Sequence, residues 1–217
     1  MSPNDLNDLP MDDEEEEDEE AILVRHEAEL SDVNHELESA PNDANLWRRR
    51  ANVLGLLGRD DEALEDLNKA LELQPGDTET LDMRGMTYSV LGRYEEALAD
   101  YNVVLAAEPD HAGHLNDRGA TLINLGRYAD GLVDLNRALE LEPNWSFALD
   151  NRGAALSALG RYEEAIADYT RSLEEWPDDP ATLASRALAY ARVGKGQEAL
   201  ADRSEEHTSE LQSRLHL

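Results

Sequence analysis

The sequence predicts an all-α protein, a solenoid of repeated helix–turn–helix units. Three observations lead to this prediction. Glycine recurs every 34 residues, proline recurs at the same interval, and apolar residues between them follow helical spacing, as Leu64, Leu67 and Leu71 do. A fixed period of this length is typical of repeat proteins, whose neighbouring units bury a shared core. The periodic residues are Gly58, Gly92, Gly126, Gly160 and Gly194, and Pro75, Pro109, Pro143 and Pro177.

Each unit is predicted to be a first helix, a turn with glycine, a second helix and a turn with proline. The reason is that glycine ends the first helix and proline terminates the second. Residues 1–20 precede the pattern as an acidic arm, and residues 21–43 form a capping helix or a partial repeat, since "HELESAPND" echoes "KALELQPGD". Four full units follow at 44–77, 78–111, 112–145 and 146–179, then an incomplete fifth at 180–202 and a tail at 203–217.

Four positions in each unit hold residues of a constant size class. The first helix carries a large apolar residue and, four positions later, a small one; the second helix carries a small residue and, four positions later, a large one. On the first helices the large residues are Trp47, Leu81, Leu115, Leu149 and Leu183, and the small ones are Ala51, Gly85, Gly119, Gly153 and Ala187. On the second helices the small residues are Ala63, Ala97, Gly131, Ala165 and Ala199, and the large ones are Leu67, Tyr101, Leu135 and Tyr169. Over residues 44–202 this pattern resembles the tetratricopeptide repeat family.

The resemblance implies a right-handed superhelix whose first helices line a concave groove that holds a peptide or a helix of another protein. We therefore expect a non-catalytic scaffold for protein–protein interaction, with no cofactor. The alternative is the regulatory part of a larger enzyme or sensor whose catalytic domain lies beyond the C-terminus. No phosphate-binding glycine loop, zinc-ligand cluster or nucleophile elbow is present in the sequence. His111 and His114, beside Asp110, fall in the turn of one unit only, so we expect surface histidines rather than a metal site.

Negative charge is concentrated at the N-terminus. The net charge is −30, and residues 12–20 are consecutive carboxylates, whose mutual repulsion predicts a disordered segment. The arm is either a solubilising tail or an electrostatic arm that occupies a basic site, for which "WRRR" at residues 47–50 is the candidate. So acidic a chain disfavours nucleic acid and anionic membranes as direct partners.

The chain contains no cysteine, which excludes disulfides and thiolate chemistry. Its start has neither the basic nor the apolar region of a secretory signal. The longest early apolar run, "AILV", is far shorter than a membrane span. We therefore expect a cytoplasmic protein.

An arginine on each first helix stands sixteen residues before an aspartate on the second helix. Because the planar guanidinium suits a two-point contact with a carboxylate, we expect an ion pair in every unit. The same arginines could instead bind anions in the groove, but five equal copies favour a structural ladder. The predicted pairs are Arg50–Asp66, Arg84–Asp100, Arg118–Asp134, Arg152–Asp168 and Arg186–Asp202.

Groove-facing residues are expected on the first helices, away from the packed positions. The predicted groove grades from basic near Arg48 to acidic further along, at Glu79 and Asp150, which suits a basic or amphipathic peptide. Met86 and Phe147 are candidate apolar anchors. The predicted groove residues are Asn45, Arg48, Asn52, Glu79, Asp82, Met86, Asn116, Phe147 and Asp150.

The repeat pattern stops inside the second helix of the fifth unit. Continuing the period would put an apolar residue at 203 and proline at 211, but the chain has Arg203 and Leu211 there. A polar capping helix would fit this position. The stretch from Arg203 to Ser213, however, resembles the translation of a common sequencing-library adapter. We therefore interpret 203–217 as non-native and the fifth unit as truncated after Asp202.

Overall fold

The structure, a computed structural model, describes residues 19–204. Its helices are α1 (Glu19–Ser39), α2 (Ala44–Leu56), α3 (Asp60–Leu73), α4 (Thr78–Val90), α5 (Tyr94–Ala107), α6 (Ala112–Asn124), α7 (Tyr128–Leu141), α8 (Ser146–Ala158), α9 (Tyr162–Glu175) and α10 (Pro180–Arg192). A further helical segment begins at residue 196 and continues to 204. Residues 19–204 contain no strand, which confirms the predicted all-α class. The predicted acidic arm and adapter-like tail lie outside the described residues, except for positions 19–20 and 203–204.

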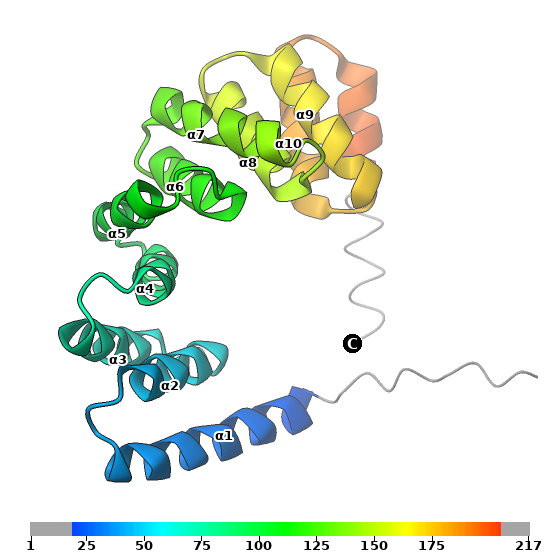
Figure 1. Ribbon diagram of the computed structural model, residues 1–217. Helices are drawn as coiled ribbons and strands as arrows, with labels where there is room; N and C mark the ends of the chain where they lie inside the picture. Colours follow the sequence, from blue (N-terminus) through cyan, green and yellow to red (C-terminus); the bar gives the residue numbers. More distant parts are fainter. Residues whose placement is uncertain (1–18, 205–217) are drawn as a thin grey trace, which may run out of the picture.

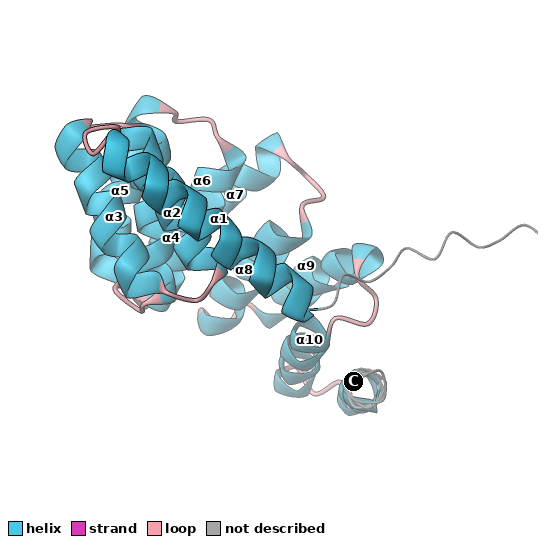
Figure 2. Cartoon of the chain, turned by 90° about the horizontal axis from the view of Figure 1, so that it is seen from below, coloured by secondary structure: helices cyan, strands magenta, loops and turns pink. Residues whose placement is uncertain are grey.

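The helices pack in chain order, each against its neighbours along the sequence. In Figure 1 they follow a curved path from α1 to α10, with α4 and α6 toward the inner side of the curve and α3, α5 and α7 toward the outer side. First helices of consecutive units also touch, as α6 and α8 do. Seen from below in Figure 2, α1 lies at the near end of the stack beside α2. The fold is the right-handed superhelical solenoid that the sequence predicts.

Each first helix ends in a turn that requires glycine. After α2, Gly58 adopts a φ of 68°, a conformation in which other side chains are strained. Its N–H donates to the carbonyl of Gly55, and the N–H of Arg59 donates to the carbonyl of Leu54, both at 2.9 Å. These two bonds satisfy carbonyls that the helix end leaves open. Equivalent bonds follow α4, α6, α8 and α10, so turn geometry explains the period of the glycines.

Most turns from a second helix to the next first helix end in a capping side chain. Asp43, Asp77 and Asp179 each accept a backbone N–H of the helix that follows them. This satisfies one of the unpaired donors at the helix start. At the start of α6 the same role falls to His111, whose ring nitrogen accepts the N–H of His114. These caps mark where α2, α4, α6 and α10 begin, whereas Trp145 ahead of α8 makes no side-chain cap bond.

Small residues let the two helices of one unit approach closely. A Cβ added at Gly119 in α6 would lie 2.8 Å from Cγ of Leu135 in α7. One added at Gly153 in α8 would lie 2.6 Å from the ring of Tyr169 in α9. Leu135 and Tyr169 are buried. Each of these side chains therefore fills the core of its unit in the space that the glycine on the opposite helix leaves open.

Helix α1 occupies the place of a second helix ahead of the first full unit. Leu30 and Val33 are buried, and Leu30 packs in one cluster with residues of α2 and α3. Asn34 of α1 accepts a hydrogen bond from Arg50 of α2 at 2.9 Å, the contact that Asn68 of α3 makes with the next unit at 2.8 Å. Helix α1 therefore makes with α2 the contact that the second helix of a full unit makes with the next first helix.

Within residues 19–204, no helix is both long enough and apolar enough to span a bilayer.

Candidate functional site

In each unit, one arginine is bound by an aspartate across the two helices. In the central unit, Nε and Nη2 of Arg118 donate to the two carboxylate oxygens of Asp134 at 2.7 and 2.8 Å. Two parallel bonds of this kind make a bidentate ion pair. The same geometry joins Arg50–Asp66, Arg84–Asp100, Arg152–Asp168 and Arg186–Asp202. All five carboxylates are buried, so these pairs belong to the packed interior rather than to an open anion site.

The same arginines also connect one unit to the next. Nη1 of Arg118 donates to Oδ1 of Asn102, on the second helix of the preceding unit, at 3.0 Å. Arg186 instead reaches the hydroxyl of Thr170 at 3.3 Å. Each guanidinium therefore ties three helices together. The asparagines were missed in the sequence, although they also recur every 34 residues. The remaining bonds of this kind are Arg50–Asn34, Arg84–Asn68 and Arg152–Asn136.

The arginine run at 48–50 is not an open basic patch. Arg48 contacts Asp77 at 3.0 Å and Glu79 at 2.9 Å. Arg49 contacts two glutamates of α1, and Arg50 belongs to the ladder. The expectation that the groove is basic near Arg48 is therefore wrong, because Asp77 and Glu79 at the start of α4 neutralise this arginine. Each arginine of this run already has an acidic partner, so none of them is left unpaired for the acidic arm.

Three carboxylates on successive first helices lie half-buried: Asp82 on α4, Asp117 on α6 and Asp150 on α8. Burial raises the pKa of all three, because the charged form loses hydration. In the described part of the chain, Oδ1 of Asp82 and Oδ1 of Asp150 are buried and accept no hydrogen bond. Asp82 faces Nε2 of His114 at 3.6 Å. Asp117 was not among the predicted groove residues.

Asn116 is buried, with 7% of its surface exposed, where the sequence suggested a groove contact. Its Oδ1 accepts from Nδ2 of Asn151 at 2.9 Å, and its own Nδ2 donates to Oδ1 of Asp117 at 3.2 Å. Asn116 therefore links α6 to α8 and orients Asp117 instead of presenting a free amide.

The remaining predicted groove residues on α2 and α4 are exposed. Asn45, Asn52, Glu79 and Met86 all have open side chains on these two helices. Glu79 is already paired with the guanidinium described above, so its charge is compensated. The uncompensated part of the surface therefore lies further along, from α4 to α8.

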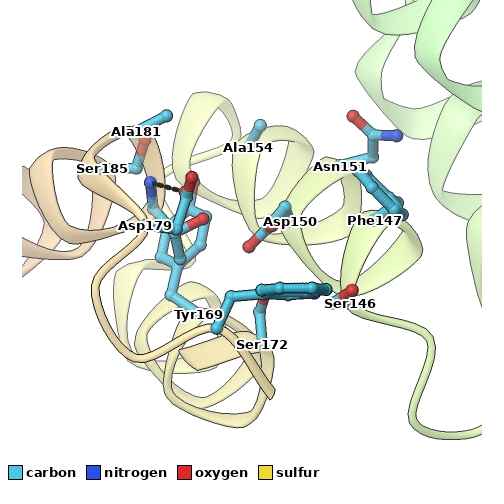
Figure 3. Close-up of a pocket in the computed structure, with 12 residues that line it drawn as sticks. Ser146, Phe147, Asp150, Asn151, Ala154, Tyr169, Ser172, Asp179, Ala181 and Ser185 are labelled. Atoms are coloured by element: carbon cyan, nitrogen blue, oxygen red, sulfur yellow. Dashed lines mark hydrogen bonds between the residues drawn. The ribbon is translucent and has the colours of Figure 1, made fainter. Parts of the chain in front are cut away.

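A pocket of about 470 Å³ lies between α8, α9 and α10. Phe147 and Trp176 line it together with Asp150, and their surfaces are 64% and 58% exposed. Figure 3 shows Asp150 near the middle of the pocket, between Phe147 on one side and Ser185 on the other. Trp176 was not predicted, although an aromatic residue before the turn proline is a departure visible in the sequence. The equivalent positions hold Gln74, Glu108 and Glu142.

Glu108, His111 and His114 are the one group in residues 19–204 whose ligand atoms lie close enough to hold a metal ion, within 4.8 Å of one another. The two imidazole rings stack with centroids 3.9 Å apart. Nδ1 of His111 accepts the backbone N–H of His114 at 3.3 Å, so the helix cap already uses that nitrogen. Asp110 pairs with Arg137 at 2.7 Å, away from the histidines. This arrangement serves the start of α6.

Comparison with known proteins shows which family these features represent. A tetratricopeptide repeat profile matches residues 44–77 and 151–179, and a second profile of the same description matches 83–147. No curated protein matches the chain significantly.

Solved structures give the same result for the fold. A tetratricopeptide repeat protein from Parabacteroides merdae is similar with a TM-score of 0.73 and 27% identity, over 88% of this chain and 75% of that one. MamA from Desulfovibrio magneticus has a TM-score of 0.71 and 21% identity, over 78% of this chain and 96% of that one. YrrB, described as a TPR protein with an unusual peptide-binding site, has a TM-score of 0.64 and 24% identity, over 84% and 97%. The chain belongs to the tetratricopeptide repeat family.

Proposed function

We propose that this protein is a non-catalytic interaction module whose first helices bind a basic segment of a partner protein. The observation that carries the proposal is the set of half-buried carboxylates Asp82, Asp117 and Asp150. Among the described residues, no arginine or lysine forms an ion pair with any of the three. The ladder aspartates on the second helices provide the contrast, since each has its own arginine.

Burying these three charges has an energetic cost. Removing a carboxylate from water without a cation partner destabilises the folded protein, and the raised pKa values express that cost. Groups that destabilise the fold in this way are typical of functional sites, where a ligand supplies the missing partner. An ammonium or guanidinium group from a bound peptide would supply it here.

Exposed apolar side chains lie beside these charges. Met86 on α4 and Phe147 on α8 have 52% and 64% of their surfaces exposed, on the same helices as Asp82 and Asp150. Large exposed side chains next to carboxylates suit a ligand with both apolar and basic groups. An amphipathic basic helix or extended peptide has this chemistry.

The family and the overall charge also support the proposal. Tetratricopeptide repeat proteins are generally interaction scaffolds, and YrrB, a protein of the same fold, is described as having a peptide-binding site. The chain carries 49 acidic residues against 19 lysines and arginines, so its field attracts a basic peptide and repels nucleic acid.

The test measures binding of a fluorescein-labelled peptide with lysine and leucine at helical spacing, by fluorescence anisotropy. The groove variant carries Asp82→Asn and Asp150→Asn, and the matched control carries Glu65→Gln and Glu174→Gln, two exposed carboxylates on second helices. Hydrogen bonds to charged groups are worth about 1.5–3 kcal/mol, so the groove variant should bind at least about tenfold more weakly.

The control variant removes the same net charge from screened positions and should lose less than about twofold. Circular dichroism checks that both variants remain helical. Equal losses in the two variants would mean that only net charge matters and would overturn the proposal. So would the absence of binding by the unmodified protein.

A further inference from the structure

The pocket between α8 and α10 lies where three groove positions hold small residues. Ala154, Ala181 and Ser185 line it. One unit earlier the same three positions are Ala120, Phe147 and Asn151, two of which are larger. The recess of about 470 Å³ therefore lies at a junction where two of the equivalent positions of the preceding unit hold larger residues.

The chemistry inside the recess is specific. Asp150 has a buried oxygen with no hydrogen-bond partner in the described chain, and Asp179, which caps α10, adds a second carboxylate to the lining. In Figure 3 Asp150 points into the space between the helices, and Asp179 lies at its edge, where it accepts the dashed hydrogen bond at the start of α10. Hydroxyl groups complete the polar part of the wall, at Ser146, Ser172, Thr182 and Ser185. All of these oxygens can accept hydrogen bonds, and the carboxylates add negative charge.

The rim is aromatic. Phe147 and Trp176 expose more than half of their surfaces at the edge of the recess. Aromatic faces attract cations, and a planar guanidinium stacks on them better than an ammonium does. A guanidinium also presents five donors, which suits several acceptors arranged around one space.

We propose that this recess is a binding pocket for a single arginine side chain, with Phe147 and Trp176 packing on it and Asp150 receiving its charge. The inference rests on the proposed function for its role, since the arginine would belong to the bound segment. It goes further by naming one anchor residue of the ligand and the three small positions that admit it.

The test uses N-acetyl-arginine amide as the probe and the indole N–H signal of Trp176 in an NMR spectrum as the readout, assigned with Trp176→Phe. The signal should shift saturably below about 50 mM probe, the range expected for a single side chain. N-acetyl-citrulline amide, which has the shape of arginine without its charge, should shift the signal at least fivefold less. N-acetyl-lysine amide should bind at least threefold more weakly than the arginine probe.

Pocket-filling variants provide the control. Ala154→Met introduces the residue that Met86 supplies at the equivalent position of α4, and it should abolish the response to the arginine probe. Ala120→Met makes the same change one unit earlier, outside the pocket, and should leave the response unchanged. Ala154 is exposed, so the larger side chain does not disturb the core.

A citrulline response equal to that of arginine, or an unchanged arginine response in Ala154→Met, would overturn the pocket, as would the lack of any saturable shift. This assay and the labelled-peptide assay fail separately. Peptide binding without an arginine response removes the pocket and leaves the groove, whereas an arginine response without peptide binding does the reverse.

Discussion

The ion pair of the central unit offers a quantitative test of what holds the solenoid together. Replacing Arg118 by methionine leaves Asp134, only 5% exposed, without either of its two guanidinium bonds and without a cation. Breaking a buried pair from one side costs about 3–5 kcal/mol. The bond to Asn102 is lost as well, so the contact with the preceding unit weakens. We expect a loss near the upper part of that range.

Two further variants, Asp134→Leu and the double variant, complete a double-mutant cycle and should lose less stability. Asp134→Leu leaves the guanidinium of Arg118, whose side chain is 25% exposed and can turn toward water, so it should cost about 1–3 kcal/mol. The double variant leaves no unpaired buried charge and should lie within about 2 kcal/mol of the unmodified protein. The coupling between the two positions is therefore expected to be at least about 2 kcal/mol.

The assay is urea unfolding of the four proteins followed by circular dichroism. Because repeat arrays do not always unfold in one step, hydrogen exchange of α6 and α7 amides is measured in parallel. Additive losses, with the double variant equal to the sum of the singles within about 0.5 kcal/mol, would refute the reasoning. They would show that each side chain is stabilised by something other than its partner.

The remaining predictions concern packing and buried charge. Gly153→Ala should destabilise by about 1–3 kcal/mol despite the better helix propensity of alanine, because its Cβ would lie 2.6 Å from the ring of Tyr169. Gly55→Ala, with no atom within 4 Å of its Cβ, should instead stabilise by up to about 1 kcal/mol; thermal unfolding of the two variants compares them, and the same sign for both would contradict the packing argument. Asp150→Asn should raise the Tm at pH 7, because burial raises the pKa of this carboxyl and its charged form therefore destabilises the fold. That gain should shrink as the pH falls through the raised pKa of the native carboxyl, where the carboxyl binds its proton; a gain independent of pH would contradict the argument.

The turns could be predicted from the period of glycine and proline because each turn depends on its own residues and not on contacts between units. A residue with positive φ such as Gly58 is required at the end of each first helix, whatever the neighbouring units contain. The ladder could also be predicted, since an arginine and an aspartate sixteen residues apart fall on the two helices of one unit. The asparagine that completes each cluster was equally periodic, and Asn102 shows that the signal was present in the sequence.

The candidate site was harder to predict because it depends on contacts between consecutive units. Nothing near Arg48 in the sequence indicates that Asp77 and Glu79 lie beside it. Asn116 was predicted to be a groove residue, but it is buried and accepts a hydrogen bond from Asn151 on the next first helix. The recess beside Phe147 likewise arises from small residues on the next helix, at a distance of one period.

The central claim is that the first helices select positive charge. It is tested most directly by comparing two labelled peptides with identical leucine positions, one with lysine and one with glutamate at every polar position, against the unmodified protein at about 0.15 M salt, where distant charges are screened. The account predicts that the lysine peptide binds at least about tenfold more tightly, since only it can neutralise the half-buried Asp82, Asp117 and Asp150. Equal affinity, or tighter binding of the glutamate peptide, would contradict it.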